Sequence, residues 1–585
     1  MSALRRAVPT AAALVLLAAG VRAAEPVAKD ASARVLAELT LPDLKATLTH
    51  VEDVAASFAP SGTLLPGTLT ALAGEKLKDP GLHGLAAGPI VVMVMAPDSA
   101  AATPGVVVFI PVKDGKAYQD ATAGMGFASS SSRGLVIAAS DARTLAAGRG
   151  LESRYRKAAS LPARVARDFR LSLNAPRLMQ LYGPLLQLGA AAAAEKLKEV
   201  PPSAKPGGTP PPEALAAIMR LEMAGAISLL EQLDELRVDL SLTPEALDSE
   251  TVMVARPGTA LAEVAQAPPA GPNRAAAILS GAGTMSASYR FDPARVSAFI
   301  VGLATAMSSD PALAGFLTPQ VLDLIRESGA VYTGEAAMRM DMRPGRMPPF
   351  AMEGVVGVTD EARALALADA GVALAVGWLD SLSHGSEPFP VQIKLERDVR
   401  RVGGVAVHRV RFSERPAPAK APEKKTGGKK AADKKAADKK AADRKPADLK
   451  AADLFKIESF NTEFAFAHGY YLTAQDPADL DRLIGRAGQP GTASTLQAEK
   501  AFGPGKQAYV DYDFLGLLKA MPAFEPGKPD PFAALRGVTT EPMLYAVSLE
   551  RGTIRFETRM PLSAFKALAA AAEKDKAAVV KETKD

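Results

Sequence analysis

The stretch 133-RGLVIAASDARTLAAG-148 decides how this chain folds, because it joins a β-strand to an α-helix through one aspartate. An apolar run typical of a buried strand ends at Ser140, and a helical pattern of small and apolar residues follows Asp141. A short acceptor side chain at such a junction satisfies free N–H groups of the first helical turn. The stretch therefore predicts a strand, a helix cap and a helix, in that order.

The same pattern recurs along the chain. A strand-like run ends in Asp or Asn, and proline often follows within two positions, where it suits the first helical turn. We interpret these side chains as caps and not as catalytic groups. The expected caps are Asp114, Asp141, Asn174, Asp292, Asp360, Asp476 and Asp513.

The units also recur in the same order, which predicts an internal duplication. "RGLVIAASDARTL" aligns with "HGYYLTAQDPADL", and this alignment places Asp141 on Asp476. Three hairpins are legible, one of them in "MLYAVSLERGTIRFETRMPL". We therefore expect an α+β fold of two similar lobes, residues 24–270 and 271–585, each a mainly antiparallel sheet with helices packed on one face.

The N-terminus has the layout of a secretory signal peptide over residues 1–23. Arg5 and Arg6 precede an apolar run from Ala11 to Val21, which is too short to span a bilayer, and small residues surround Ala23. No longer apolar run of about 18 residues follows, so no transmembrane span is expected after cleavage. The chain has no cysteine, which excludes disulfides and thiolate zinc sites. A periplasmic or secreted protein is predicted.

A Lys/Ala/Asp-rich segment, residues 416–453, interrupts the second lobe between two predicted strands. It holds twelve Lys or Arg against six Asp or Glu, and the whole chain carries only +5, so the globular body is mildly acidic and nucleic-acid binding is not expected. Its five-residue period winds the lysines around a helix and makes no stripe. We interpret the segment as a solvated spacer, with contact to an anionic partner as the alternative. That contact would use Lys429, Lys430, Lys434, Lys435, Lys439 and Lys440.

The search for catalytic and metal-binding residues finds no convergent set. The five histidines lack metal-ligand spacing, and His50 is expected as an exposed residue flanking an apolar helix stripe. Asp511 and Asp513 would share one face of a regular strand, as a hydrolase pair requires, but Asp513 is also an expected cap. "SAFK" at Ser563 has the S-x-x-K spacing of penicillin-binding enzymes without their further motifs, and is read as a helix cap. No cofactor is predicted.

Three methionines alternate in "AMRMDM", so Met338, Met340 and Met342 share one strand face. Thioethers bind copper(I), but methionine also fills gaps in cores, and without a nearby His or Cys core packing is the favoured interpretation. The sequence as a whole predicts an exported, non-enzymatic cell-envelope protein that acts as a binding or scaffold module for an unknown envelope protein or lipid. The alternative is a periplasmic carrier of a lipid or other hydrophobic ligand.

Overall fold

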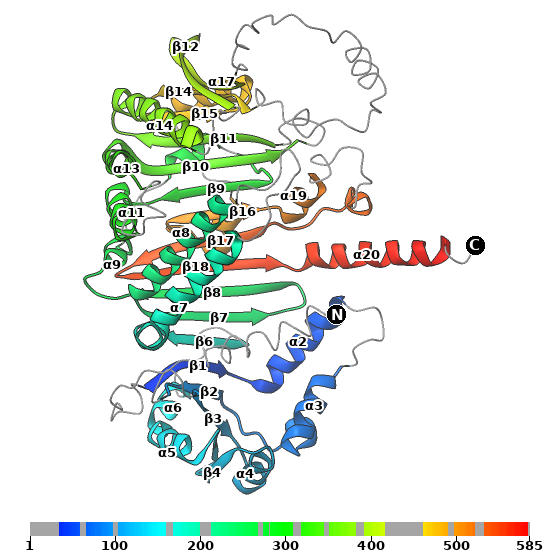
Figure 1. Cartoon of the computed structure of the whole chain (residues 1–585). Coiled ribbons are helices and arrows are strands. Elements are labelled where there is room, and N and C mark those ends of the chain that lie inside the picture. The colour runs from blue at the N-terminus through cyan, green and yellow to red at the C-terminus, as the bar shows by residue number, and fades with distance from the viewer. Residues whose placement is uncertain are drawn as a thin grey trace, which may run out of the picture.

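In the computed structural model of the chain, one antiparallel sheet runs through the whole molecule (Figure 1). The structure describes residues 34–58, 66–97, 103–159, 168–198, 212–266, 273–279, 281–307, 317–343, 350–381, 391–415, 460–489, 496–520 and 532–582. The predicted signal peptide and the 416–453 insert, with its six lysines, lie outside these residues.

Every strand of the sheet pairs antiparallel with its neighbours. From the bottom of Figure 1 to the top, the strands are β4 (Ala128–Ser132), β5 (Leu135–Ala139), β3 (Gly105–Pro111), β2 (Ile90–Met95), β1 (Val35–Leu41), β6 (Phe169–Asn174), β7 (Leu233–Leu242), β8 (Ala246–Ala255), β18 (Thr553–Pro561), β17 (Met543–Glu550), β16 (Ala508–Tyr512), β9 (Met285–Arg290), β10 (Tyr332–Met342), β11 (Phe350–Val358), β15 (Tyr470–Ala474), β14 (Thr462–Ala467), β13 (Val405–Glu414) and β12 (Val391–Val402).

The pairing order of the first eight strands is repeated by the strands from β9 onward. Strand β1 lies between β2 and β6, and β9 likewise lies between β10 and β16. Beyond β2 the order is β3, β5 and β4, and beyond β10 it is β11, β15 and β14. Strands β8 and β18 occupy matching positions and pair with each other, with Glu250 opposite Glu557. Among the described residues of the first half, no hairpin corresponds to β12–β13. The α+β class with a large antiparallel sheet is confirmed, but the two expected lobes share a single sheet.

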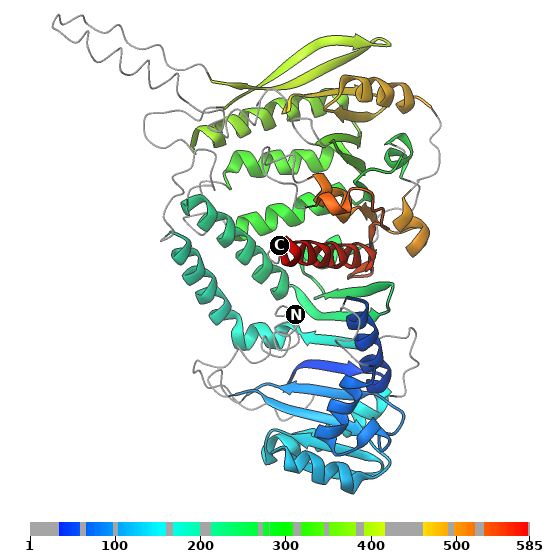
Figure 2. The ribbon, with the colours of Figure 1, turned by 90° about the vertical axis from the view of Figure 1, so that its right-hand side faces the viewer.

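Helices cover both faces of the sheet, so the prediction of helices on one face is wrong. On β15, Tyr471 packs with α13 and α14, whereas its neighbour Leu472 packs with α10 and α17 on the other side. On β5, Val136 packs with α4 and its neighbour Ile137 with α5. Helices α7, α8, α11, α13 and α14 form one layer, teal to green in Figure 2. Successive strand residues point to opposite faces, and both faces are apolar toward the two ends of the sheet.

The helices are α2 (Leu44–Phe58), α3 (Thr68–Leu77), α4 (Gly115–Gly124), α5 (Ala142–Gly150), α6 (Glu152–Ala159), α7 (Ala175–Lys198), α8 (Pro212–Glu231), α9 (Ala260–Val264), α10 (Arg274–Leu279), α11 (Pro293–Met307), α13 (Pro319–Val331), α14 (Glu361–Ser381), α17 (Pro477–Ala487), α18 (Gln497–Phe502), α19 (Phe514–Ala520) and α20 (Ser563–Glu582), with short 3₁₀ turns η2 (Pro80–Leu82) and η6 (Ala533–Leu535). In the part that the structure describes, no helix is long and apolar enough to cross a bilayer.

Four tight hairpins in the described residues fix the register locally, and one of them joins β12 to β13 through Gly403–Gly404, both with positive φ. Two-residue loops join β4 to β5, β14 to β15 and β17 to β18, and both loop residues have positive φ in each: Arg133–Gly134, His468–Gly469 and Arg551–Gly552. Such loops match the twist of antiparallel strands, and glycine adopts the second conformation without strain. The strands on either side of the lysine-rich insert also pair, with Val407 opposite Ala465.

Candidate functional site

All seven expected caps are confirmed, because each side chain accepts a hydrogen bond from the backbone of the helix that follows it. Asp141 accepts from Thr144 N at 2.8 Å, and Asp476 accepts from Ala478 N at 3.1 Å. The other five do the same for α4, α7, α11, α14 and α19: Asp114, Asn174, Asp292, Asp360 and Asp513. The hydroxyl and N–H of Thr144 also lower the pKa of Asp141 below its ordinary value.

The two aspartates of "YVDYDF" do not form a catalytic pair. Asp511 is buried and accepts from Gln497 N at 2.7 Å and from Ala498 N at 2.8 Å, so it holds the start of α18. Burial raises its pKa. Asp513 lies beyond the end of β16 and caps α19. Each carboxylate therefore serves a different helix.

The histidines and the S-x-x-K stretch also have structural surroundings. His50 is partly exposed, as expected, and its Nδ1 lies 2.6 Å from Oδ1 of the buried Asp168. His408 is buried beside Phe464, and burial lowers its pKa. Ser563 is the first residue of α20, and Lys566 donates to the carbonyl of Pro244. Among the described residues, no group of three His, Asp or Glu is placed to hold a metal ion.

The prediction that Met338, Met340 and Met342 share a strand face is confirmed by the register of β10. Met340 lies opposite Met285 of β9 on one side and opposite Met352 of β11 on the other. The three expected methionines are all half-buried, so they are not fully packed in a core.

The line of cross-strand neighbours through Met285, Met340 and Met352 extends over further strands, perpendicular to them. We call this line the methionine row. Tyr512 of β16 lies opposite both Met285 and Met543. Leu544 of β17 lies opposite Arg559 of β18. Because these strands are antiparallel, the next pair in the same register, Met543 and Met560, lie side by side. The methionine row consists of Met560, Met543, Tyr512, Met285, Met340 and Met352. It crosses six strands, about 24 Å at the usual strand spacing of about 4.8 Å.

The methionine row belongs to a broader apolar face of the strands from β6 to β11. The side chains of β6 and β7 on this face are Phe169, Leu171, Leu173, Leu236, Val238, Leu240 and Leu242, and all are half-buried. Two members are more exposed: Phe556 at 38 % and Met352 at 40 %. A sheet normally packs its apolar face fully against a second layer. An apolar face that keeps this exposure is a candidate binding surface.

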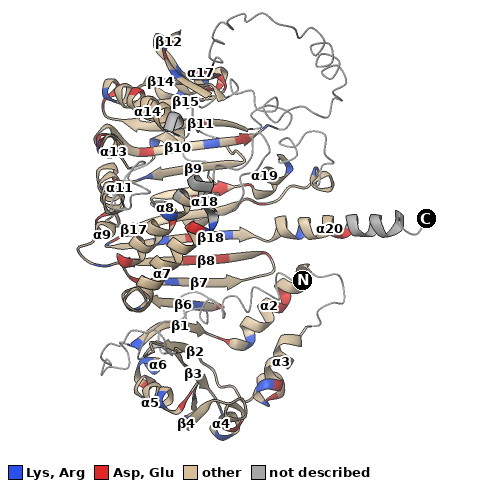
Figure 3. Cartoon of the chain, in the orientation of Figure 1, with Lys and Arg blue, Asp and Glu red and all other residues tan. Residues whose placement is uncertain are grey.

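The opposite face of the same strands is charged, and its charges pair with one another. Asp239 lies 2.6 Å from Arg170 and 3.2 Å from Arg237, and Glu250 pairs with Arg555 across the junction of β8 and β18. Figure 3 shows charged residues on β7, β8 and β18, while helices α7, α11 and α14 are mostly uncharged. The charged face thus resembles a solvated sheet surface, and the apolar face does not.

Sequence reasoning found the methionines of β10 but missed the rest of the methionine row. Met285, Met543 and Met560 each stand alone in their strands, so no local pattern marks them. They come together only through pairing between strands far apart in the sequence.

Comparisons with known proteins found no relative of this chain. No protein-family model, no curated protein sequence and no solved structure matches the chain.

Proposed function

We propose that this protein acts by binding and not by catalysis, and that a hydrophobic ligand of the lipid class occupies the methionine row. The supporting observation is an apolar face that continues across six strands and exposes Phe556 near one end and Met352 at the other. Methionine side chains are flexible and polarizable, so they adapt to ligands of irregular shape. The length of about 24 Å exceeds the roughly 15 Å that one leaflet contributes to a bilayer core, so the row is long enough for an extended acyl chain.

Titration of the mature chain with a fluorescent fatty acid tests this proposal. Saturable binding is expected, together with co-purifying lipid detected by mass spectrometry. Met352→Glu and Phe556→Glu place a charge on exposed positions of the apolar face and should weaken binding at least tenfold. Met125→Glu is the matched control, because Met125 is 41 % exposed after α4 and outside this face. Equal binding by all three variants, or turnover abolished by a single substitution, would overturn the proposal.

We propose, further, that export through a signal peptide over residues 1–23 delivers the protein to the cell envelope. N-terminal sequencing of protein recovered from the envelope should begin near Ala24. A retained protein partner in the same fraction, with no lipid, would favour a scaffold over a carrier.

The 416–453 insert is proposed to be a spacer, because it joins β13 and β14, which already pair without it. Deleting residues 416–453 should leave fatty-acid binding and the free energy of unfolding unchanged. The anionic-partner alternative, through Lys429, Lys430, Lys434, Lys435, Lys439 and Lys440, predicts salt-sensitive binding to phosphatidylglycerol vesicles that this deletion abolishes.

The repeated strand order supports the proposal that the two halves, residues 24–270 and 271–585, arose by internal duplication. Matching caps, hairpin loops and strand neighbours recur in both halves. Exchanging core residues between matching positions, described in the Discussion, tests this equivalence.

A further inference from the structure

Five methionine side chains gather on the apolar face of β9, β10 and β11. Met340 lies at their centre, with Met285 opposite it on β9 and Met352 opposite it on β11. Met338 and Met342 lie two residues before and after Met340, so they share its face of the sheet. We call these five residues the methionine cluster. Adjacent strands are about 4.8 Å apart and alternate residues of one strand about 6.8 Å apart, which long side chains can bridge.

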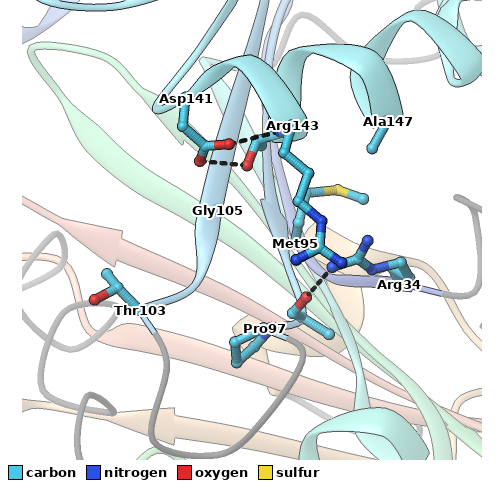
Figure 4. Close-up of a pocket in the computed structure, with 10 residues that line it drawn as sticks. Arg34, Met95, Pro97, Thr103, Gly105, Asp141, Arg143 and Ala147 are labelled. Carbon is cyan, nitrogen blue, oxygen red and sulfur yellow. Dashed lines mark hydrogen bonds between the residues drawn. The ribbon is translucent and has the colours of Figure 1, made fainter. Parts of the chain in front are cut away.

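The methionine cluster is not closed off from solvent. Met352 is 40 % exposed, and the other four members are half-buried. On β2, by contrast, methionine fills a core: Met93 and Met95 are 0 % and 2 % exposed and pack in the apolar cluster under α5. Figure 4 shows Met95 beneath this helix. Methionine therefore has two different surroundings in this molecule, and only that of β9, β10 and β11 leaves thioethers accessible to a ligand.

The matching positions of the first half carry no sulfur. Ala139 of β5 lies two residues before its cap and faces Val107, as Ala474 of β15 lies two residues before its cap and faces Glu353. Following the strand registers onward from these pairs gives the residues that match the cluster. Met285, Met338, Met340, Met342 and Met352 match Ala37, Val92, Val94, Ala96 and Val106, in that order. Because alanine and valine occupy the same strand geometry there, the fold does not require thioethers at these positions.

Thioether sulfur is a soft, neutral ligand, and it selects copper(I) over harder divalent ions. Methionine has three rotatable side-chain bonds, so several sulfurs can turn toward one point. The chain has no cysteine, so no thiolate competes for such an ion. The charged neighbours on β10, Arg339 and Asp341, lie on the opposite face and pair there at 3.1 Å. The chemistry that the methionine cluster offers is therefore that of a thioether site.

We propose that the methionine cluster binds one copper(I) ion through its sulfurs, with Met340 as the central ligand and at least two of its neighbours completing the site. The ion binds and leaves as copper(I), so no electron is transferred. The site does not rest on the proposed lipid binding, because the ion needs sulfur atoms and a lipid needs apolar area.

Isothermal titration calorimetry of the mature chain with silver nitrate, in a chloride-free buffer, tests the site with a soft monovalent ion that keeps its oxidation state. One silver ion per chain should bind. Met340→Leu should weaken binding at least tenfold, and the triple variant Met285→Leu, Met340→Leu and Met352→Leu should abolish it. Leucine nearly conserves the volume of methionine, so these variants should fold, which circular dichroism checks. Copper(I), added anaerobically with ascorbate, should show sulfur neighbours in X-ray absorption spectra.

Three control variants separate the site from other methionines and from lipid binding. Met125→Leu removes a methionine that is 41 % exposed outside the cluster, and Met543→Leu removes one whose sulfur accepts from the hydroxyl of Tyr545 at 3.5 Å; both should bind silver as the unchanged chain does. Phe556→Glu should weaken fatty-acid binding and leave silver binding unchanged.

The proposal is overturned if the unchanged chain shows no saturable silver binding, if Met340→Leu binds silver equally well, or if nitrogen or oxygen atoms surround the copper in place of sulfur. Silver binding by a chain that binds no fatty acid would support the metal site and overturn the proposed function. The two proposals therefore fail separately.

Discussion

The two helix-on-sheet contacts made by α5 and by α17 have the same backbone arrangement and opposite chemistry. Under α5, Met93 and Val107 face each other across two strands, both 0 % exposed, and Ala147 packs over them. Under α17, the matching pair is Arg339 and Glu353. The matching helix residue is Arg482, six positions after its cap as Ala147 is after Asp141.

In the second contact, a buried carboxylate lies between two guanidinium groups. Glu353 is 3 % exposed, and it pairs with Arg339 at 2.5 Å and with Arg482 at 2.8 Å. The first contact is held by close apolar packing and the second by charge pairing. The comparison shows that this sheet and helix geometry requires complementary contacts and does not require apolar ones.

The largest effect is expected from Glu353→Ala, which leaves Arg339 and Arg482 facing each other without a carboxylate. Breaking a buried pair costs about 3–5 kcal/mol, and we expect about 3 kcal/mol because Arg482 is partly exposed. Chemical denaturation measures the free energy of unfolding. Glu550→Ala, at an exposed position of β17, is the control and should change it by less than about 0.5 kcal/mol. A loss below about 1 kcal/mol for Glu353→Ala would show that the ion pairs do not hold this contact.

The triple exchange Arg339→Met, Glu353→Val and Arg482→Ala gives α17 the residues found under α5. Replacing a buried ionic set by apolar residues that pack well is neutral or stabilising by about 1–4 kcal/mol, because the cost of desolvating the charges is removed. We expect the same sign here, measured by the same denaturation experiment. A loss of more than about 2 kcal/mol would mean that the two positions are not equivalent, and would count against the proposed duplication.

Removing the caps compares the two helix starts directly. Asp141→Ala and Asp476→Ala should each lose about 1 kcal/mol of the free energy of unfolding, since N–H groups of the first turn lose their acceptor. Asp476→Ala should lose slightly more than Asp141→Ala, because Asp476 also pairs with Arg343. This ion pair is partly exposed, so the extra loss should be below about 1 kcal/mol. Asp141→Asn and Asp476→Asn keep an acceptor and should change little. If the Asn and Ala variants lost equal amounts of stability, the side chains would not stabilise the helix starts by accepting hydrogen bonds.

The smallest effect concerns pH and His408 in the hairpin β12–β13, which has no counterpart among the described residues of the first half. Burial lowers the pKa of His408, so the folded chain binds fewer protons there than the unfolded chain. The stability that His408 contributes is present above its ordinary pKa of about 6.5 and is lost as pH falls below it. Denaturation between pH 8 and pH 5 should show a steeper loss for the unchanged chain than for His408→Gln. If the free energy of unfolding changed equally with pH in both chains, His408 would not cause the pH dependence.

Local features of the fold, such as helix caps and tight hairpins, could be predicted from the sequence. The caps depend on a side chain and the next three residues, as at Asp141 and Thr144, and the tight hairpins depend on an adjacent pair such as His468 and Gly469. The place of the insert could also be predicted, because the strands on either side of it alternate in the expected way. The methionine row could not, since Met285, Met352 and Met543 come from strands that are distant in the chain.

By itself, the sequence determined the α+β class, the capped helix starts and the hairpins, because each depends on contacts between residues close in the chain. Only the tertiary structure decided that both halves share one sheet, that helices cover both of its faces and that an apolar face remains half-exposed. The pairing of β8 with β18 joins residues about 300 positions apart, and edge strands present the same backbone donors and acceptors to any partner. Which edges meet is therefore decided by the packing of the whole chain.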